Sequence, residues 1–382
     1  MRGAIIKRGD SYRIKVSLGK DAVSGKYQAY YETVRGSKKE ADKRLRELLW
    51  QLDNGTFVKP GKSSVYEYLI AWLNDYAKPN LSPRTHELYS YICEKHLIPA
   101  LGNVILVDLK PQHLQRLYAE KKASGLSGRT VQLIHVTIHK ALKCAVKTGL
   151  LNRNVAEAVD VPKIQKHQMK VMSEADMQKF LEEAGNTPYY ALFYTSLFTG
   201  MRRSELLALR WSDLDLILCQ LSVTRSLQYN SKVKIEDRIT FKEPKTRKGK
   251  RLIALTPSNT IVLRQHYEKE NAQRLALGYH GLTSNDLVFS HYDGSPFLPN
   301  TITHAWIKIT RKCGLSGIRL HDARHTHASL LLKQGVHPKV VQERLGHGSI
   351  QITLDTYSHV APGLQQAAAE KFDGLIFERS NL

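Results

Sequence analysis

The chain has 382 residues, 42% of them hydrophobic and 24% charged, and its 57 lysines and arginines against 35 aspartates and glutamates give a formal net charge of +22. The hydrophobic content is that of a globular protein, and the length suits two or three domains. Basic residues exceed acidic ones in each part of the chain, which argues against a single basic tail and favours a polyanionic partner, nucleic acid before an anionic membrane surface.

The sequence lacks the marks of membrane-spanning, secreted and disulfide-stapled proteins. It holds no run of 18 apolar residues, and its N-terminal apolar stretch is too short for a signal peptide. The four cysteines lie far apart without a C-x-x-C pair, so their spacing suggests neither a zinc ribbon nor a disulfide framework. We therefore expect a cytoplasmic, nucleoid-associated protein.

Residues 1–60 predict a small sheet backed by one helix. Rough period-2 alternation indicates three strands, at residues 5–7, 12–18 and 27–34, and the S-x-x-E spacing of Ser37 and Glu40 opens a helix that runs to about residue 54. Arg13 and Lys15 alternate with apolar residues, so one face of the sheet is predicted to be basic. This face either lies in a DNA groove or is an ordinary solvated surface.

Residues 61–160 are predicted to form four or five helices. Ser64 begins a second capping box, Ser82 precedes a proline suited to a first helical position, and Ser127 precedes an apolar-periodic run to Lys147. Residues 161–170 are polar, basic and without periodicity, so we interpret them as an interdomain linker.

Residues 171–382 are predicted to mix helices with short strands. A helix starts at Ser173, residues 221–224 and 239–241 look extended, and residues 245–251 resemble the tip of a β-hairpin that leads into residues 252–255. The fold class is therefore multi-domain and mainly α with small β elements: a three-stranded sheet plus helix, a helical domain and an α+β domain.

A glycine turn followed by charged residues is the first candidate site. In Thr199-Gly200-Met201-Arg202-Arg203-Ser204-Glu205, Arg202 is predicted to lie in the first turn of a helix and Glu205 one turn further on. An arginine at a helix start can present a bidentate fork to a phosphate. Taken alone, the same pattern also fits a surface residue or a salt-bridge partner.

Three further motifs follow in order towards the C-terminus. His321 and Arg324 are three residues apart and therefore lie on one face of a predicted helix. Leu345-Gly346-His347 comes next, and Tyr357 stands ten residues beyond that histidine. The order Arg, Lys, His-x-x-Arg, Leu-Gly-His and Tyr, at these separations, resembles the tyrosine recombinase family, the integrases of phages and transposons.

The resemblance extends over most of the chain. Residues 171–382 resemble the catalytic domain of the family, and residues 61–160 resemble its helical, SAM-like core-binding domain. Residues 1–60 are similar, by the order of their elements, to the arm-type DNA-binding domain of integrases from conjugative transposons and phages of Gram-positive bacteria.

By position, the resemblance implies six catalytic residues: Arg202, Lys245, His321, Arg324, His347 and Tyr357. The two arginines would clamp the scissile phosphate, and the two histidines would donate hydrogen bonds to it. The lysine would protonate the departing sugar oxygen, and the tyrosine would be the nucleophile. The acidic residue of the family that orients the arginine and histidine side chains corresponds to Glu205, for which a plain surface carboxylate remains the alternative.

The resemblance also implies a reaction and an assembly. The enzyme would cut double-stranded DNA attachment sites through a 3′-phosphotyrosyl intermediate, exchange strands through a Holliday junction as a homotetramer, and work with an excisionase or a host DNA-bending protein. A helix at about residues 361–372 would pack in cis or on a neighbouring subunit.

We expect neither a cofactor nor a metal ion. The sequence contains no G-x-x-x-x-G-K phosphate loop, no H-E-x-x-H motif and no carboxylate cluster of the kind that a two-metal nuclease needs. A type IB topoisomerase and a catalytically inert DNA-binding protein on the same fold are the competing interpretations.

Overall fold

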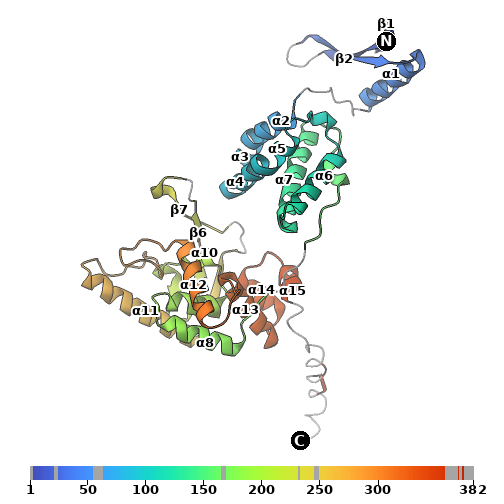
Figure 1. Ribbon diagram of the computed structural model, residues 1–382. Coiled ribbons are helices and arrows are strands. Elements are labelled where there is room, and N and C mark those ends of the chain that lie inside the picture. The colour runs from blue at the N-terminus through green and yellow to red at the C-terminus, as the bar shows by residue number, and fades with distance from the viewer. Residues whose placement is uncertain are drawn as a thin grey trace. The chain divides into compact units, whose positions relative to one another are not determined.

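The computed structural model describes residues 3–20, 25–54, 63–164, 169–230, 233–244 and 249–357, together with residues 369, 372 and 373; at residue 235 and residues 355–357 it describes the backbone alone. The chain divides into two compact units, Met1–Lys166 and His167–Leu382 (Figure 1).

The first unit begins with a three-stranded antiparallel sheet in the order β1-β2-β3. Its strands are β1 (Gly3–Arg8), β2 (Ser11–Lys20) and β3 (Tyr27–Arg35), and helix α1 (Lys38–Asp53) follows. Ser37 and Glu40 form the expected capping box, because each side chain accepts a backbone N–H of the other residue. Ile14, Val16 and Leu48 form a small core between the sheet and α1. The predicted sheet and helix are confirmed.

The rest of the first unit is helical. The elements are α2 (Val65–Ala71), η1 (Trp72–Ala77), α3 (Lys78–Asn80), α4 (Pro83–Ile92), η2 (Cys93–Leu97), α5 (Ile98–Leu101), η3 (Leu106–Asp108), α6 (Pro111–Ala123), α7 (Gly128–Lys147) and η4 (Val155–Ala158). The side chains of Ser64, Ser82 and Ser127 cap α2, α4 and α7, as their sequence positions predicted. The π-helical turns η1 and η2, which join neighbouring α-helices into longer runs, were not predicted.

The second unit packs helices around one large apolar core. The helices are α8 (Glu174–Gly185), α9 (Tyr190–Thr199), α10 (Arg203–Leu206), η5 (Trp211–Asp213), η6 (Ile235–Asp237), α11 (Pro257–Ala276), α12 (Pro299–Lys312), α13 (Leu320–Lys333), α14 (Pro338–Leu345) and α15 (Ile350–Tyr357). Phe180, Phe193 and Trp306 are fully buried in this core, with ring centroids 4.3 to 5.8 Å apart. The nearly uniform burial of α9 explains its apolar sequence.

Two small sheets lie beside this core. Strands β4 (Leu214–Asp215), β5 (Gln220–Val223) and β8 (Arg251–Ala254) form one sheet in the order β4-β5-β8, and β6 (Ser226–Tyr229) pairs with β7 (Ile239–Lys242) in the other. The predicted hairpin between residues 239–241 and 252–255 is therefore wrong in its pairing. Because β6 follows β5 after only two residues and takes β7 as its partner, β8 pairs with β5 instead.

Candidate active site

Arg202 lies between the αL turn at Gly200 and the start of helix α10, and both fix its backbone. Helix α9 ends at Gly200, whose φ of +64° is the left-handed conformation that glycine adopts without strain. Arg202 then has extended backbone angles and is the N-cap of α10, so it precedes the first helical turn in which it was predicted to lie. The difference arises because Glu205 accepts the backbone N–H of Arg202 at 3.0 Å, which closes a capping box at this position.

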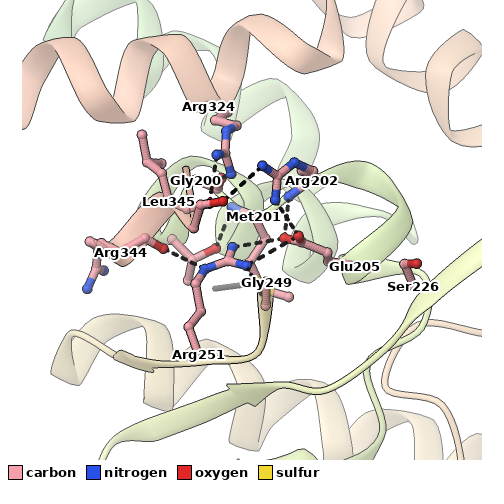
Figure 2. A network of polar contacts seen from close by, with 12 residues as sticks. Gly200, Met201, Arg202, Glu205, Ser226, Gly249, Arg251, Arg324, Arg344 and Leu345 are labelled. Carbon is pink, nitrogen blue, oxygen red and sulfur yellow. Dashed lines mark hydrogen bonds and ion pairs between the residues drawn. The ribbon is translucent and has the colours of Figure 1, made fainter. Parts of the chain in front are cut away.

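The Glu205 carboxylate is the centre of a polar network. Figure 2 shows the guanidinium groups of Arg202 and Arg251 converging on this carboxylate from two sides. Arg202 Nη1 donates to Oε1 at 2.7 Å, and Arg251 donates from Nη1 to Oε1 at 3.2 Å and from Nη2 to Oε2 at 2.9 Å. The side chains of Glu205 and Arg251 are 5% and 6% exposed, whereas that of Arg202 is 38% exposed. Glu205 is thus a buried, doubly paired carboxylate, and the alternative of a plain surface residue is ruled out by its burial.

The charges around Glu205 decide its ionisation. Burial raises the pKa of its carboxyl group, but the hydrogen bonds and charge of Arg251, followed by the charge of Arg202, outweigh burial and hold the pKa below its usual value. Glu205 is therefore ionised at neutral pH.

Arg324 is held by the ends of two helices. It lies in the second turn of α13 and is 2% exposed. Its Nη1 donates to the carbonyl of Gly200 at 2.8 Å, and its Nη2 donates to the carbonyl of Leu345 at 2.7 Å. Both carbonyls lie at helix C-termini, which carry partial negative charge and favour a cation. The Gly346 carbonyl, one residue further, accepts from Arg202 Nη2 at 3.3 Å, so both arginines are fixed on the same turn.

Three histidines lie near Arg324. His321 lies in the first turn of α13, and its ring centroid is 4.8 Å from that of His325. His347 follows the αL turn at Gly346 and pairs through Nδ1 with Thr353 Oγ1 at 2.9 Å. Desolvation, and then the charge of Arg324, lowers the pKa of His321, and the same two causes lower the pKa of His347 to about 4. His321 and His347 are therefore neutral at neutral pH and donate through single N–H groups.

A fourth histidine, His327, joins the end of α9 to the end of α14. His327 is buried, its Nδ1 pairs with the Leu197 carbonyl at 2.9 Å, and its Nε2 accepts from Arg344 Nε at 2.9 Å. Arg344 also donates to the carbonyls of Ala254 and Phe198, at 2.9 and 3.0 Å. His327 is thus a structural residue, which links α13 to α9 and α14.

The remaining candidates lie partly outside the described residues. Lys245 falls in the segment 245–248, between β7 and β8, which lies outside them. Tyr357 is the last residue of α15, and its side chain is likewise outside the description. The structure therefore brings together Arg202, Glu205, His321, Arg324 and His347 and leaves the other two untested.

The basic face of the N-terminal sheet is present as predicted. Lys15 is exposed and Arg13 is half-buried, and both cations lie over the ring of Tyr31, at 5.9 and 4.5 Å from its centroid. Tyr31 belongs to β3 and lies opposite Lys15 in the register. Cation–π contact with an exposed ring keeps both positive charges on one surface.

Arg251 and Arg344 were missed as parts of the site. Arg251 was placed at the tip of a predicted β-hairpin, but it is the first residue of β8 and its side chain is buried. The alternation of strand β8 could have indicated that Arg251 is buried, because Arg251 shares a face with buried Ile253 while Leu252 points to solvent. Arg344 gave no such signal, because its partners lie 17 to 146 residues away in the sequence.

Within the described ranges, no three His, Cys, Asp or Glu side chains gather as a metal site would require. In the same part of the chain, no helix has the length and apolar content needed to cross a bilayer.

Two family models match the chain. Residues 165–363 match the model of the phage integrase family, and residues 64–122 match that of the phage integrase N-terminal SAM-like domain. The chain is 30% identical to an integrase of Streptomyces ambofaciens, over 90% of this chain and 89% of that protein. It is 26% identical to the ICEBs1 integrase of Bacillus subtilis, over 96% of this chain and 97% of that protein.

Solved structures of integrases have the same fold. The Tn1549 transposon integrase in complex with transposon right end DNA superimposes with a TM-score of 0.69 at 20% identity, over 81% of this chain and 99% of that chain. The lambda integrase tetramer bound to a Holliday junction superimposes with a TM-score of 0.59 at 16% identity, over 94% of this chain and 95% of that chain.

Proposed function

Because the chain belongs to the phage integrase family and is a tyrosine recombinase, we propose that it cuts and rejoins duplex DNA at the attachment sites of a mobile element, with Tyr357 as the nucleophile. The observation that carries the proposal is the joint anchoring of Arg202 and Arg324. Their guanidinium groups come from segments far apart in the sequence and are fixed on the adjacent carbonyls of Leu345 and Gly346.

The two arginines meet the charge of the reacting phosphate. A phosphodiester is negatively charged and repels nucleophiles, and further charge develops on its nonbridging oxygens as the fifth bond to phosphorus forms. Guanidinium groups whose positions are fixed beforehand stabilise this charge without reorganising at the moment of reaction. In this role Arg202 reaches the phosphate through its exposed part and Arg324 acts from its anchored position between two helix ends. Neutral His321 and His347 add one hydrogen bond each.

The cleavage step exchanges one ester for another. The Tyr357 phenol loses its proton to solvent, its Oη forms a bond to phosphorus, and the bond from phosphorus to the 5′-oxygen breaks. Lys245 gives a proton to that oxygen, which leaves as a 5′-hydroxyl. A phenol has a pKa near 10 in water, and the nearby cations favour its ionised form. The DNA remains joined to the enzyme as a 3′-phosphotyrosyl ester.

Rejoining is the same step in reverse with a different strand. The 5′-hydroxyl of a second duplex attacks the phosphotyrosyl phosphorus, and Tyr357 leaves. Because the ester is kept throughout, the exchange needs no external energy source. We propose that four copies hold two duplexes and exchange one pair of strands at a time through a Holliday junction, in the cytoplasm at the nucleoid. The lambda integrase tetramer bound to a Holliday junction, which shares the fold, supports this arrangement.

The first unit supplies DNA binding in this proposal. Residues 61–160 bind the core of the attachment site, the basic face of residues 1–60 binds separate arm sites through Arg13 and Lys15, and residues 161–170 link these domains to the catalytic domain of residues 171–382. The match of residues 64–122 to the SAM-like domain model supports the first assignment. An excisionase or a host DNA-bending protein completes the complex and sets its direction.

The decisive experiment traps the covalent intermediate. The substrate is a nicked duplex carrying the junction sequence of the excised, circular form of the element, in which loss of the short strand beside the nick prevents rejoining. Wild type and Tyr357→Phe are incubated with this DNA, without added metal, and run on a denaturing protein gel. We expect a slower, DNA-labelled band for the wild type alone.

Two other outcomes separate the competing functions. If both proteins bind the DNA and neither forms the band, the chain is a catalytically inert DNA-binding protein. If the wild type relaxes supercoiled plasmids that lack the junction as fast as plasmids that contain it, the activity is that of a topoisomerase.

A further inference from the structure

Arg251 is a buried arginine that the family resemblance did not assign to the reaction. It begins β8, directly after the segment that contains Lys245, and its side chain is 6% exposed. Burying a guanidinium is costly unless hydrogen bonds and an opposite charge compensate for the lost hydration. Such burial also prevents Arg251 from lying along a DNA backbone as an exposed basic residue does. Its charge is therefore used inside the protein.

The contacts of Arg251 reach three segments of the site. Two of its nitrogens bind both oxygens of Glu205, its Nε donates to the Arg344 carbonyl at 2.7 Å, and its Nη1 donates to the Gly249 carbonyl at 3.3 Å (Figure 2). A Cβ placed on Gly346 would lie 3.0 Å from Arg251 Nη1, so the guanidinium packs directly against the turn that precedes His347. One side chain thus joins the start of β8, the carboxylate next to Arg202 and the turn at residues 344–346.

We propose that Arg251 is a positioning residue, which fixes Glu205 and thereby the guanidinium of Arg202 against the scissile phosphate. Glu205 without Arg251 would offer both oxygens to Arg202, and a bidentate pair would turn that guanidinium towards the carboxylate. With Arg251 bound to both oxygens, Arg202 contacts Glu205 through Nη1 and the Gly346 carbonyl through Nη2. This inference rests on the proposed role of Arg202 in phosphate binding.

A purely structural ion pair makes a different prediction. Loss of a structural pair lowers stability and leaves the chemistry of the folded protein intact. Loss of a positioning residue slows the chemical step of folded, DNA-bound enzyme, because an error of about 1 Å in placement costs on the order of 100-fold in rate. A positioning residue that acts through Glu205 also loses its effect once Glu205 is gone.

The test is a double-mutant cycle on the full-length protein. Arg251→Gln, Glu205→Gln and the double variant are compared with wild type in single-turnover cleavage of the nicked substrate, at protein concentrations that saturate the DNA. We expect each single change to slow cleavage roughly 10- to 100-fold, with DNA affinity within about twofold of wild type. The double variant should be no slower than the slower single variant, because both changes break one unit.

Matched variants make the result unambiguous. Arg274→Gln removes another buried arginine, paired with Asp286 at 3.4 Å and remote in sequence, and should reduce thermal stability without slowing cleavage. Arg251→Lys keeps the charge without the two-pronged contact and should cleave at an intermediate rate; if Arg251→Gln does not fold, this variant carries the cycle.

Two results would overturn the inference. Either Arg251→Gln cleaves at the wild-type rate, or the double variant is slowed by the product of the two single effects. Failure of the wild type itself to form the covalent band would instead reject the proposed function, so the two failures are distinguishable.

Discussion

The N-terminal sheet and the network around Glu205 both carry positive charge, but they hold it in different surroundings. On the sheet, the cations of Arg13 and Lys15 lie over the exposed ring of Tyr31, with Lys15 exposed and Arg13 half-buried. In the network, Arg251 and Arg324 are buried and bonded to carboxylate and carbonyl oxygens. A buried guanidinium with several fixed partners is held in one position, as stabilising the reacting phosphate requires. An exposed guanidinium can adjust to a phosphate backbone and contributes binding affinity.

The largest effect on cleavage is expected when the buried guanidinium of Arg324 is replaced by a group that cannot make several hydrogen bonds at once. Arg324→Lys keeps the positive charge but cannot bind the Gly200 and Leu345 carbonyls and a phosphate together. We expect single-turnover cleavage to fall by about 10²- to 10³-fold, the usual cost of losing one donor that stabilises transition-state charge, while DNA affinity changes by less than about threefold.

The control for this prediction is Arg274→Lys, the same exchange at a buried arginine of α11. It should leave the cleavage rate of the folded protein unchanged. An Arg324→Lys protein that binds DNA as weakly as it cleaves it would show that Arg324 serves affinity, and the contrast between the two regions would be lost.

The glycine turn under the network gives the next largest effect. Gly200 has a φ of +64°, and an added Cβ would lie 2.7 Å from Leu345 Cδ2 and 2.9 Å from His327 Cδ2. Gly200→Ala therefore adds overpacking to the cost of a left-handed alanine, and we expect the free energy of unfolding to fall by about 2–4 kcal/mol. Gly314→Ala, at φ +75° with open space around it, should cost only about 1 kcal/mol. Urea denaturation of the two variants measures the difference, and equal costs would contradict the packing argument.

The structure explains why the sequence predicted one region better than the other. The strands of residues 3–35 and the caps at Ser37, Ser64 and Ser173 follow from signals within a few residues, namely alternation and S-x-x-E or S-x-x-D spacing. These elements form where local preference and burial agree.

The network depends on contacts between distant segments. Arg251 and Glu205 are 46 residues apart, and Arg324 and Gly200 are 124 residues apart. The motifs around Arg202, Arg324 and His347 were recognised by resemblance. The pairing of β6 with β7 and the buried partner Arg344 had no local signal strong enough to place them, and for Arg251 the only local signal was the alternation of its strand. Sequence patterns thus identified the residues proposed to contact a phosphate and missed Arg251 and Arg344, which hold those residues in place.

Acid should destabilise the second unit, in which His327 is buried beside Arg344. Burial, and then the charge of Arg344, lowers the pKa of His327 to about 3, whereas an unfolded histidine has a pKa near 6.5. Between these values the unfolded chain binds a proton that the folded protein excludes, so stability falls as the pH drops below about 6.5. From pH 7 to pH 5 this one residue should cost about 2 kcal/mol.

The measurement compares urea denaturation at pH 7 and pH 5. His327→Gln, which has no titrating group, should lose about 2 kcal/mol less than wild type between these values, although it is less stable at pH 7. His304→Gln, at an exposed position of α12, should show the wild-type dependence. A His327→Gln protein with the full wild-type loss would place the acid sensitivity elsewhere, for example at His325 and His347, whose pKa values are each lowered to about 4.

The smallest effects are expected on the sheet, where charge is exposed. Arg13→Gln and Lys15→Gln should each reduce the slope of log affinity against log salt concentration by about 1 for DNA that carries an arm site, because each change removes one phosphate contact and the counterion that it releases. Arg46→Gln removes the same charge from the exposed surface of α1, the helix whose Leu48 packs with Ile14 against the other face of the sheet. It should leave the slope unchanged.

Neither sheet variant should slow cleavage of a nicked substrate that holds the core sequence alone, since these side chains supply affinity and not the geometry of the reacting phosphate. If either one slows that reaction as much as Arg324→Lys does, exposure and burial do not divide affinity from chemistry in this protein.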